Sequence, residues 1–136
     1  MKLFTMMVLI LCSQFCYAQT VVVVSKDSQI EALDDQYVAN IFLARTSRFP
    51  NGEKAQPIEL KNSDLRTHFY QEISGKTPRQ LNAYWTTLVF TGKGKPPRRY
   101  ANTDDLQAKL LAQSGSITYL SLDEVTDEMK IVYRFP

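Results

Sequence analysis

The sequence has little cysteine and little histidine. Its 136 residues contain two cysteines and one histidine, and both cysteines, Cys12 and Cys16, lie within the first eighteen residues. Residues 19–136 therefore offer no disulfide, no thiol nucleophile and no thiolate metal site. The single histidine, His68, precedes the apolar Phe69 in a helical pattern. Such a position is more typical of a surface or boundary side chain than of a ligand or a base.

Motifs of catalysis are missing as well. The sequence contains no GxSxG element, no Walker loop, no HExxH and no calcium-binding loop. Its acidic pairs at 34–35, 104–105 and 123–124 each fit the first turn of a helix, where carboxylates complement the helix dipole. We therefore predict that the protein is not an enzyme, with no catalytic residues, no cofactor and no metal.

No apolar run is long enough to span a membrane. Lys2 precedes the apolar residues 3–12, and the more polar residues 13–18 end with small side chains at Cys16 and Ala18. A spanning helix needs about 20 apolar residues, so a membrane anchor is the weaker interpretation. The layout predicts a signal peptide over 1–18, cleaved after Ala18. The absence of later cysteines favours the bacterial periplasm as the destination.

Charge of one sign does not dominate. The sequence has sixteen Lys and Arg residues and fourteen Asp and Glu residues, which leaves a net charge of +2. This balance argues against a general nucleic-acid or membrane-surface binder. Residues 19–136 are too few for two domains of ordinary size, so we expect one domain.

Strands and helices alternate along 19–136. The run Val21–Val24 is β-branched throughout, typical of a strand buried on both faces, as in parallel sheets. Further strands are predicted at 57–60, 116–120 and 130–135. Helices are predicted at 33–43, from an N-cap at Ser63 to Gly75, from Thr77-Pro78 through Leu88, and from 103 to 113 with Gly115 as the C′ residue. Residues 91–97 suit neither a helix nor a central strand. This alternation predicts an α/β sheet.

The first candidate for ligand binding is the segment 61–66, which follows a strand and opens a helix. Exposed backbone N–H groups and the helix dipole favour an anion there. Ser63 can donate a hydrogen bond, Asp64 is in the same turn, and Arg66 can form a charge-assisted pair. The alternative is that Ser63 only caps the helix and Arg66 is a solvated surface residue.

The second candidate is the basic segment 91–99, TGKGKPPRR. Its glycines allow the backbone to approach an oxyanion, and Lys93 and Lys95 supply positive charge. The segment lacks the spacing of a nucleotide-binding loop. A solvated connector is the alternative interpretation.

Several motifs resemble one family of binding proteins. Residues 38–45 (VANIFLAR) and 49–52 (FPNG) resemble the "IFLGK…W/F-x-DG" segment of periplasmic substrate-binding proteins of the phosphate ABC transporter type. The segment 115–119 (GSITY) is similar to their "GAIGY" strand. Other segments are similar to the short members of that group, in the same order along the chain: 65–69, 84–85 and 90–97.

This resemblance implies a periplasmic-binding-protein-like lobe, with a mixed, mostly parallel sheet flanked by helices. It also implies capture of a phosphate-like oxyanion for a membrane transporter. The predicted ligand-binding residues are Ser63, Asp64, Arg66, Lys93 and Lys95, with Ser63 matching the serine of the family's phosphate loop and the lysines closing over the anion. A second hypothesis is a ligand-free module of the same fold, which docks onto a membrane sensor or an envelope complex.

Overall fold

The computed structural model describes residues 19–61 and 64–136, which form five strands and four α-helices. The predicted signal peptide over 1–18 and the predicted N-cap Ser63 lie outside the described residues. The strands are β1 (Thr20–Ser25), β2 (Gln56–Leu60), β3 (Arg98–Tyr100), β4 (Ser116–Ser121) and β5 (Met129–Arg134). The helices are α1 (Asp35–Phe42), α2 (Asp64–Ser74), α3 (Pro78–Phe90) and α4 (Thr103–Ala112), and a 3₁₀ turn spans Leu122–Glu124.

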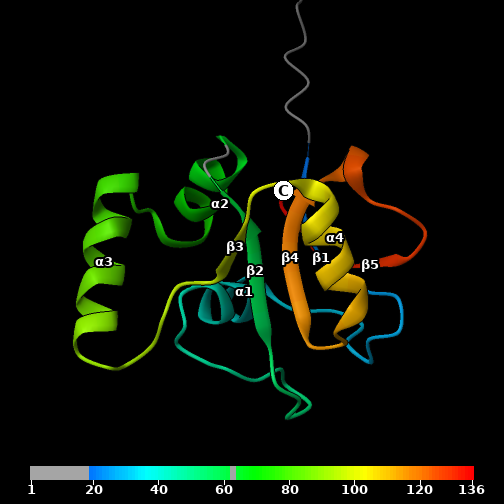
Figure 1. The fold of residues 1–136 in the computed structure, drawn as a ribbon, viewed down its shortest axis with the longest axis horizontal. Coiled ribbons are helices and arrows are strands. Elements are labelled where there is room, and N and C mark those ends of the chain that lie inside the picture. The colour runs from blue at the N-terminus through cyan, green and yellow to red at the C-terminus, as the bar shows by residue number, and fades with distance from the viewer. Residues whose placement is uncertain (1–18, 62–63) are drawn as a thin grey trace, which may run out of the picture.

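The strands form one mixed sheet in the order β3-β2-β4-β1-β5, which confirms the predicted fold class (Figure 1). β2 pairs in parallel with β3 and β4, and β1 pairs antiparallel with β4 and β5. Four of the five strands therefore run in one direction. Val21–Val24 is fully buried, as predicted, although both of its neighbours are antiparallel. Helices on both faces, not strand direction, explain the run of valines.

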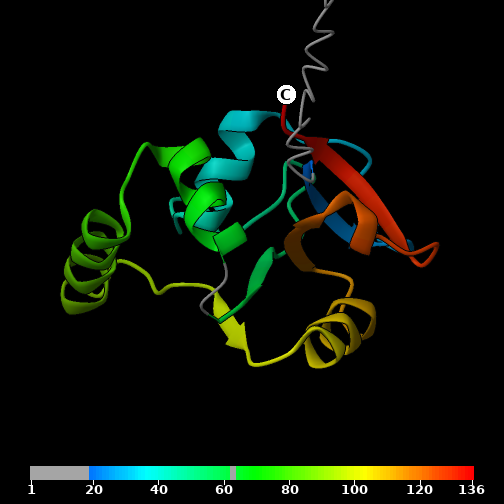
Figure 2. The same ribbon diagram turned by 90° about the horizontal axis from the view of Figure 1, so that it is seen from above.

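Helices cover both faces of the sheet (Figure 2). Val22 and Val24 belong to the core beneath α1 and α2, whereas Val21 and Val23 belong to the core beneath α4. This alternation follows from the two-residue period of a strand. The same alternation sends Ile58 of β2 toward α4.

Side-chain caps begin α1 and α3, and a glycine ends α2. The Asp34 side chain caps α1 by accepting a hydrogen bond from the N–H of Tyr37. Thr77 and Gln80 form a complete capping box at the start of α3. Gly75, in the left-handed region at φ 68°, follows the last residue of α2.

Two details differ from the sequence prediction. Gly115 was predicted as the C′ residue of α4, but the C-cap is Gln113 and Gly115 has no positive φ. A Cβ at Gly115 would lie 2.5 Å from the carbonyl oxygen of Lys54, so glycine is needed for the close approach of two backbones. β3 was not predicted, because Arg98–Tyr100 is a short edge strand with exposed arginines.

α3 stands apart from the other helices in both views (Figures 1 and 2). It packs through one face, where Leu81 and Trp85 are buried. The hydroxyl of Tyr84 donates a hydrogen bond to the carbonyl of Leu43 at 2.6 Å. Across 19–61 and 64–136, no helix is long and apolar enough to cross a membrane.

Candidate functional site

The carboxyl end of β2 carries a buried acid that the sequence analysis missed. Glu59 is fully buried and accepts three hydrogen bonds. Arg66 Nε donates to Oε2 at 2.7 Å, the Tyr70 hydroxyl donates to Oε1 at 2.9 Å, and the Tyr119 hydroxyl donates to Oε2 at 2.9 Å. α2 supplies Arg66 and Tyr70, and β4 supplies Tyr119, so the carboxylate joins three elements.

The surroundings of Glu59 keep both tyrosines protonated. Burial raises the pKa of Tyr70 well above its usual value, and the nearby Glu59 charge raises it further. Burial and the Glu59 charge raise the pKa of Tyr119 in the same way. A protonated hydroxyl can donate to a carboxylate, whereas two neighbouring anions would repel. This network, Glu59 with Arg66, Tyr70 and Tyr119, is thus a hydrogen-bonded polar cluster at the edge of the core.

Arg66, predicted as the counter-charge of an anion, belongs to this cluster. Its side chain is 16% exposed and its Nε lies 2.7 Å from Glu59. The positive charge of Arg66 is therefore already balanced by a carboxylate in the protein. Asp64, the first residue of α2, is exposed at the same end of β2.

Carboxylates also occupy the start of α4 at this edge of the sheet. Asp104 and Asp105 lie in its first turn, and Asn102 caps it by accepting from the N–H of Asp105. As predicted from the sequence, this acidic pair complements the helix dipole. An anion at this edge would meet negative side chains at both helix starts.

The amino end of β2 borders a groove whose charged lining residues are positive instead of negative. Its volume is about 620 Å³, and it lies between the end of α1, the start of β2, the loop before β3 and Lys109 of α4. Six cationic residues and no carboxylate line it: Arg45, Lys54, Lys93, Lys95, Arg98 and Lys109. Within the part of the chain that the structure describes, none of the six pairs with a carboxylate. We call it the cationic groove.

Glycines shape the loop that carries two of these lysines. Gly92 follows α3 with φ 69°, a conformation that favours glycine. A Cβ at Gly94 would lie 3.1 Å from Leu88 Cδ2 and 3.2 Å from Ala44 Cβ. The absence of a side chain at Gly94 therefore lets the backbone between Lys93 and Lys95 pack closely against α3 and the end of α1.

Among the described residues, the structure does not bring the predicted site residues together. The β2–β3 register places Ile58 opposite Arg98 and Leu60 opposite Tyr100. The loop before β3, with Lys93 and Lys95, thus lies at the amino end of β2, while Asp64 and Arg66 lie beyond its carboxyl end. A five-residue strand separates them by about 13 Å along its axis. Anion binding at either end remains a prediction.

Three groove cations were missed by sequence reasoning. Arg45, Lys54 and Lys109 come from separate segments with no shared motif. Only the strand order, which places β2 between β3 and β4, brings them near the loop 91–97. Among the described residues, no group of His, Cys, Asp and Glu is arranged to hold a metal ion.

Comparisons with known proteins rest on structure alone. No protein-family model matches the sequence, and no curated protein matches it. A phosphate ABC transporter substrate-binding protein from Clostridium perfringens, solved with bound phosphate, is similar with a TM-score of 0.62 at 12% identity. An ABC-type phosphate transport receptor from Vibrio cholerae has a TM-score of 0.64 at 11% identity. PstS from Borrelia burgdorferi has a TM-score of 0.56 at 13% identity.

These three matches cover 84% of this chain and 44%, 45% and 46% of the respective solved chains. The chain therefore spans less than half the length of the proteins it resembles. At such low identity the likeness establishes the fold and leaves the ligand open. The resemblance predicted from the sequence is thus confirmed at the level of the fold: this chain is a single α/β lobe of the kind found in phosphate ABC transporter substrate-binding proteins.

Proposed function

We propose that this chain is an exported, non-enzymatic protein that binds a phosphate-like oxyanion in the cationic groove. The observation that carries the proposal is a groove lined by six cations and no carboxylate. We further propose a periplasmic location and a membrane transporter as the partner, by analogy with the solved neighbours.

Electrostatics favour the groove over the carboxyl end of β2. Several like charges that border one concave surface raise the local concentration of a counter-ion. Lysine and arginine donate charge-assisted hydrogen bonds to phosphate oxygens. At the other end, Asp64 and the Glu59–Arg66 pair leave less net positive charge for a ligand. Ser63 with the neighbouring Asp64 and Arg66 forms the second candidate site.

The groove is open, and its lysines and arginines are largely exposed. A small anion there stays partly hydrated, so we expect modest affinity with strong salt dependence. Its volume of about 620 Å³ also leaves room for a larger phosphorylated solute.

Titration calorimetry of the folded protein with phosphate, and then sulfate, at low ionic strength tests the proposal. We expect saturable 1:1 binding, weakened about fivefold or more by the double change Lys93→Gln and Lys95→Gln. Arg134→Gln is the matched control, because it removes an exposed cation on β5, outside the groove. Loss of binding in Ser63→Ala, with no effect of the lysine changes, would move the site to the start of α2.

The alternative is a module that has this fold without a ligand and docks onto a membrane sensor or an envelope complex. The observation in its favour is the carboxyl end of β2, where Asp64 and the Glu59–Arg66 pair leave little net positive charge for an anion. Absence of heat up to millimolar phosphate, from protein with a cooperative unfolding transition, would reject anion binding and favour this module.

A further inference from the structure

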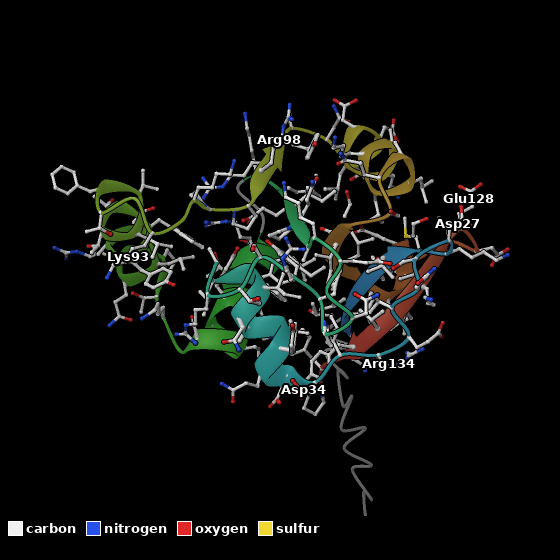
Figure 3. All side chains as sticks on the ribbon, turned by 90° about the horizontal axis from the view of Figure 1, so that it is seen from below. Asp27, Asp34, Lys93, Arg98, Glu128 and Arg134 are labelled. Carbon is white, nitrogen blue, oxygen red and sulfur yellow. The ribbon has the colours of Figure 1, made fainter. Side chains whose placement is uncertain are left out.

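Positive charge is concentrated in one part of the molecule. Residues 76–103, which include α3, the following loop and β3, contain six cations and no carboxylate. The rest of 19–136 contains nine cations and fourteen carboxylates. Figure 3 shows Lys93 at the end formed by α3, whereas Asp27 and Glu128 lie at the opposite end. The molecule is therefore electrically asymmetric although its net charge is small.

Exposed apolar side chains occur within this same positive part. Val89 and Phe90, the last two residues of α3, are 53% and 91% exposed. On the inward face of α3, Leu81 and Trp85 are buried in the hydrophobic core. Lys93 and Lys95 follow Phe90 within five residues and are exposed. We call Val89, Phe90, Lys93 and Lys95 the α3 tip.

We propose that the α3 tip docks onto the surface of an anionic phospholipid bilayer. An aromatic and an aliphatic side chain can enter the boundary between headgroups and acyl chains, while adjacent lysines stay among the lipid phosphates. Stable anchoring at a membrane surface takes two signals, such as an apolar group and a basic patch. The tip has both, and no carboxylate between residues 76 and 103 opposes a negative surface.

A lipid surface fits the tip better than a protein partner does. A stable protein interface buries about 800 Å² on each partner, far more than two exposed apolar side chains supply. An anionic bilayer requires no matching shape, because its charge is spread over the surface. Long, exposed lysines can therefore follow it without a fixed geometry.

This inference goes beyond anion binding in the groove and can fail separately. Val89 and Phe90 do not line the cationic groove, whereas the docking surface depends on them. We expect Phe90 to contribute about tenfold or more to the lipid partition coefficient. Each lysine should raise the same partition coefficient about fivefold at low salt.

The test is co-sedimentation of the protein with vesicles of phosphatidylglycerol and phosphatidylcholine, compared with vesicles of phosphatidylcholine alone. We expect binding only to the anionic vesicles, weakened by added salt. Phe90→Ser should lower that binding about tenfold or more and leave calorimetric phosphate binding unchanged. Leu122→Ser, the matched control, alters an apolar side chain that is 38% exposed beside Asp123 and Glu124, and should bind as the unaltered protein does.

Four results would overturn the proposal. Equal binding to both vesicle types would remove the role of charge, and unchanged binding of Phe90→Ser would remove the role of the tip. No sedimentation at millimolar lipid would make a protein partner the occupant of this surface. Self-association that Phe90→Ser abolishes would make a second copy of the chain the occupant.

Discussion

Charged side chains lie in opposite environments at the two ends of β2. At the carboxyl end, Glu59 is fully buried and accepts hydrogen bonds from Arg66, Tyr70 and Tyr119. At the amino end, the cationic groove collects six exposed or half-buried cations with no carboxylate among its lining residues. The buried charges at the carboxyl end stabilise the fold, whereas the cations at the amino end remain accessible to solvent.

The difference follows from the dielectric environment of each end. A buried carboxylate is costly to desolvate, so it persists only when partners satisfy it, and removal of one partner is strongly destabilising. Exposed cations are hydrated and screened, so their mutual repulsion costs little. We therefore expect the loss of a charged side chain at the carboxyl end to alter stability and the loss of one at the amino end to alter binding.

The largest expected effect on stability comes from Glu59→Gln. The substitution keeps the size of the side chain but removes the charge that balances Arg66 and accepts from two buried tyrosines. We expect the free energy of unfolding to fall by about 3 kcal/mol, as measured by urea denaturation.

Glu72→Gln is the matched control, because Glu72 is an exposed carboxylate on α2, the helix that carries Arg66. Its effect should stay below about 0.5 kcal/mol. Equal stability of Glu59→Gln and Glu72→Gln would contradict the role assigned to the buried cluster.

The second expected effect appears at alkaline pH. Unfolded tyrosines ionise near pH 10, whereas burial and Glu59 raise the pKa of Tyr70 and Tyr119 in the folded protein. Above pH 10 the unfolded state therefore binds fewer protons than the folded state, and stability falls as the pH rises. Each of these tyrosines should contribute up to about 1.4 kcal/mol per pH unit.

Urea denaturation at a series of pH values between 9 and 11 measures this slope. The Tyr119→Phe variant should show a clearly smaller slope, because one of the two buried hydroxyls that donate to Glu59 is gone. A slope that Tyr119→Phe leaves unchanged would show that the buried cluster does not govern alkaline unfolding.

Local signals predicted the elements well where they were complete. Thr77 and Pro78 supply an N-cap and an N1 proline, and α3 begins where they predict. Val21–Val24 identifies a strand buried on both faces. Arg98–Tyr100 gave no such signal, because an exposed edge strand of three residues needs no apolar alternation.

The candidate site was harder to predict, because its members are distant in sequence. Glu59 meets Tyr119 sixty positions later, and a single acid in the short segment 57–60 does not reveal its partners. Lys93 and Lys95 were found from their local cluster, while Arg45 and Lys109 join them only through the strand order. Sequence patterns report local structure, and contacts across the sheet require the topology.

A third, smaller effect is expected at the backbone approach beside the groove. Gly115→Ala would place a Cβ 2.5 Å from the carbonyl oxygen of Lys54, so the two segments must separate. We expect a loss of about 2 kcal/mol in the free energy of unfolding, as measured by thermal or urea denaturation. Ser114→Ala, at an exposed neighbouring position, should have almost no effect, and a similar loss there would contradict the steric explanation.

The smallest expected effect on stability belongs to the cationic groove. Lys93→Gln combined with Lys95→Gln removes two exposed cations that pair with no carboxylate in the described part of the chain, so the free energy of unfolding should change by less than about 0.5 kcal/mol. Any change should be a gain at low salt, because like charges are removed, and it should vanish as salt is added. A clear loss of stability would mean that these lysines hold the fold together as Glu59 does, and the division between the two ends of β2 would then be wrong.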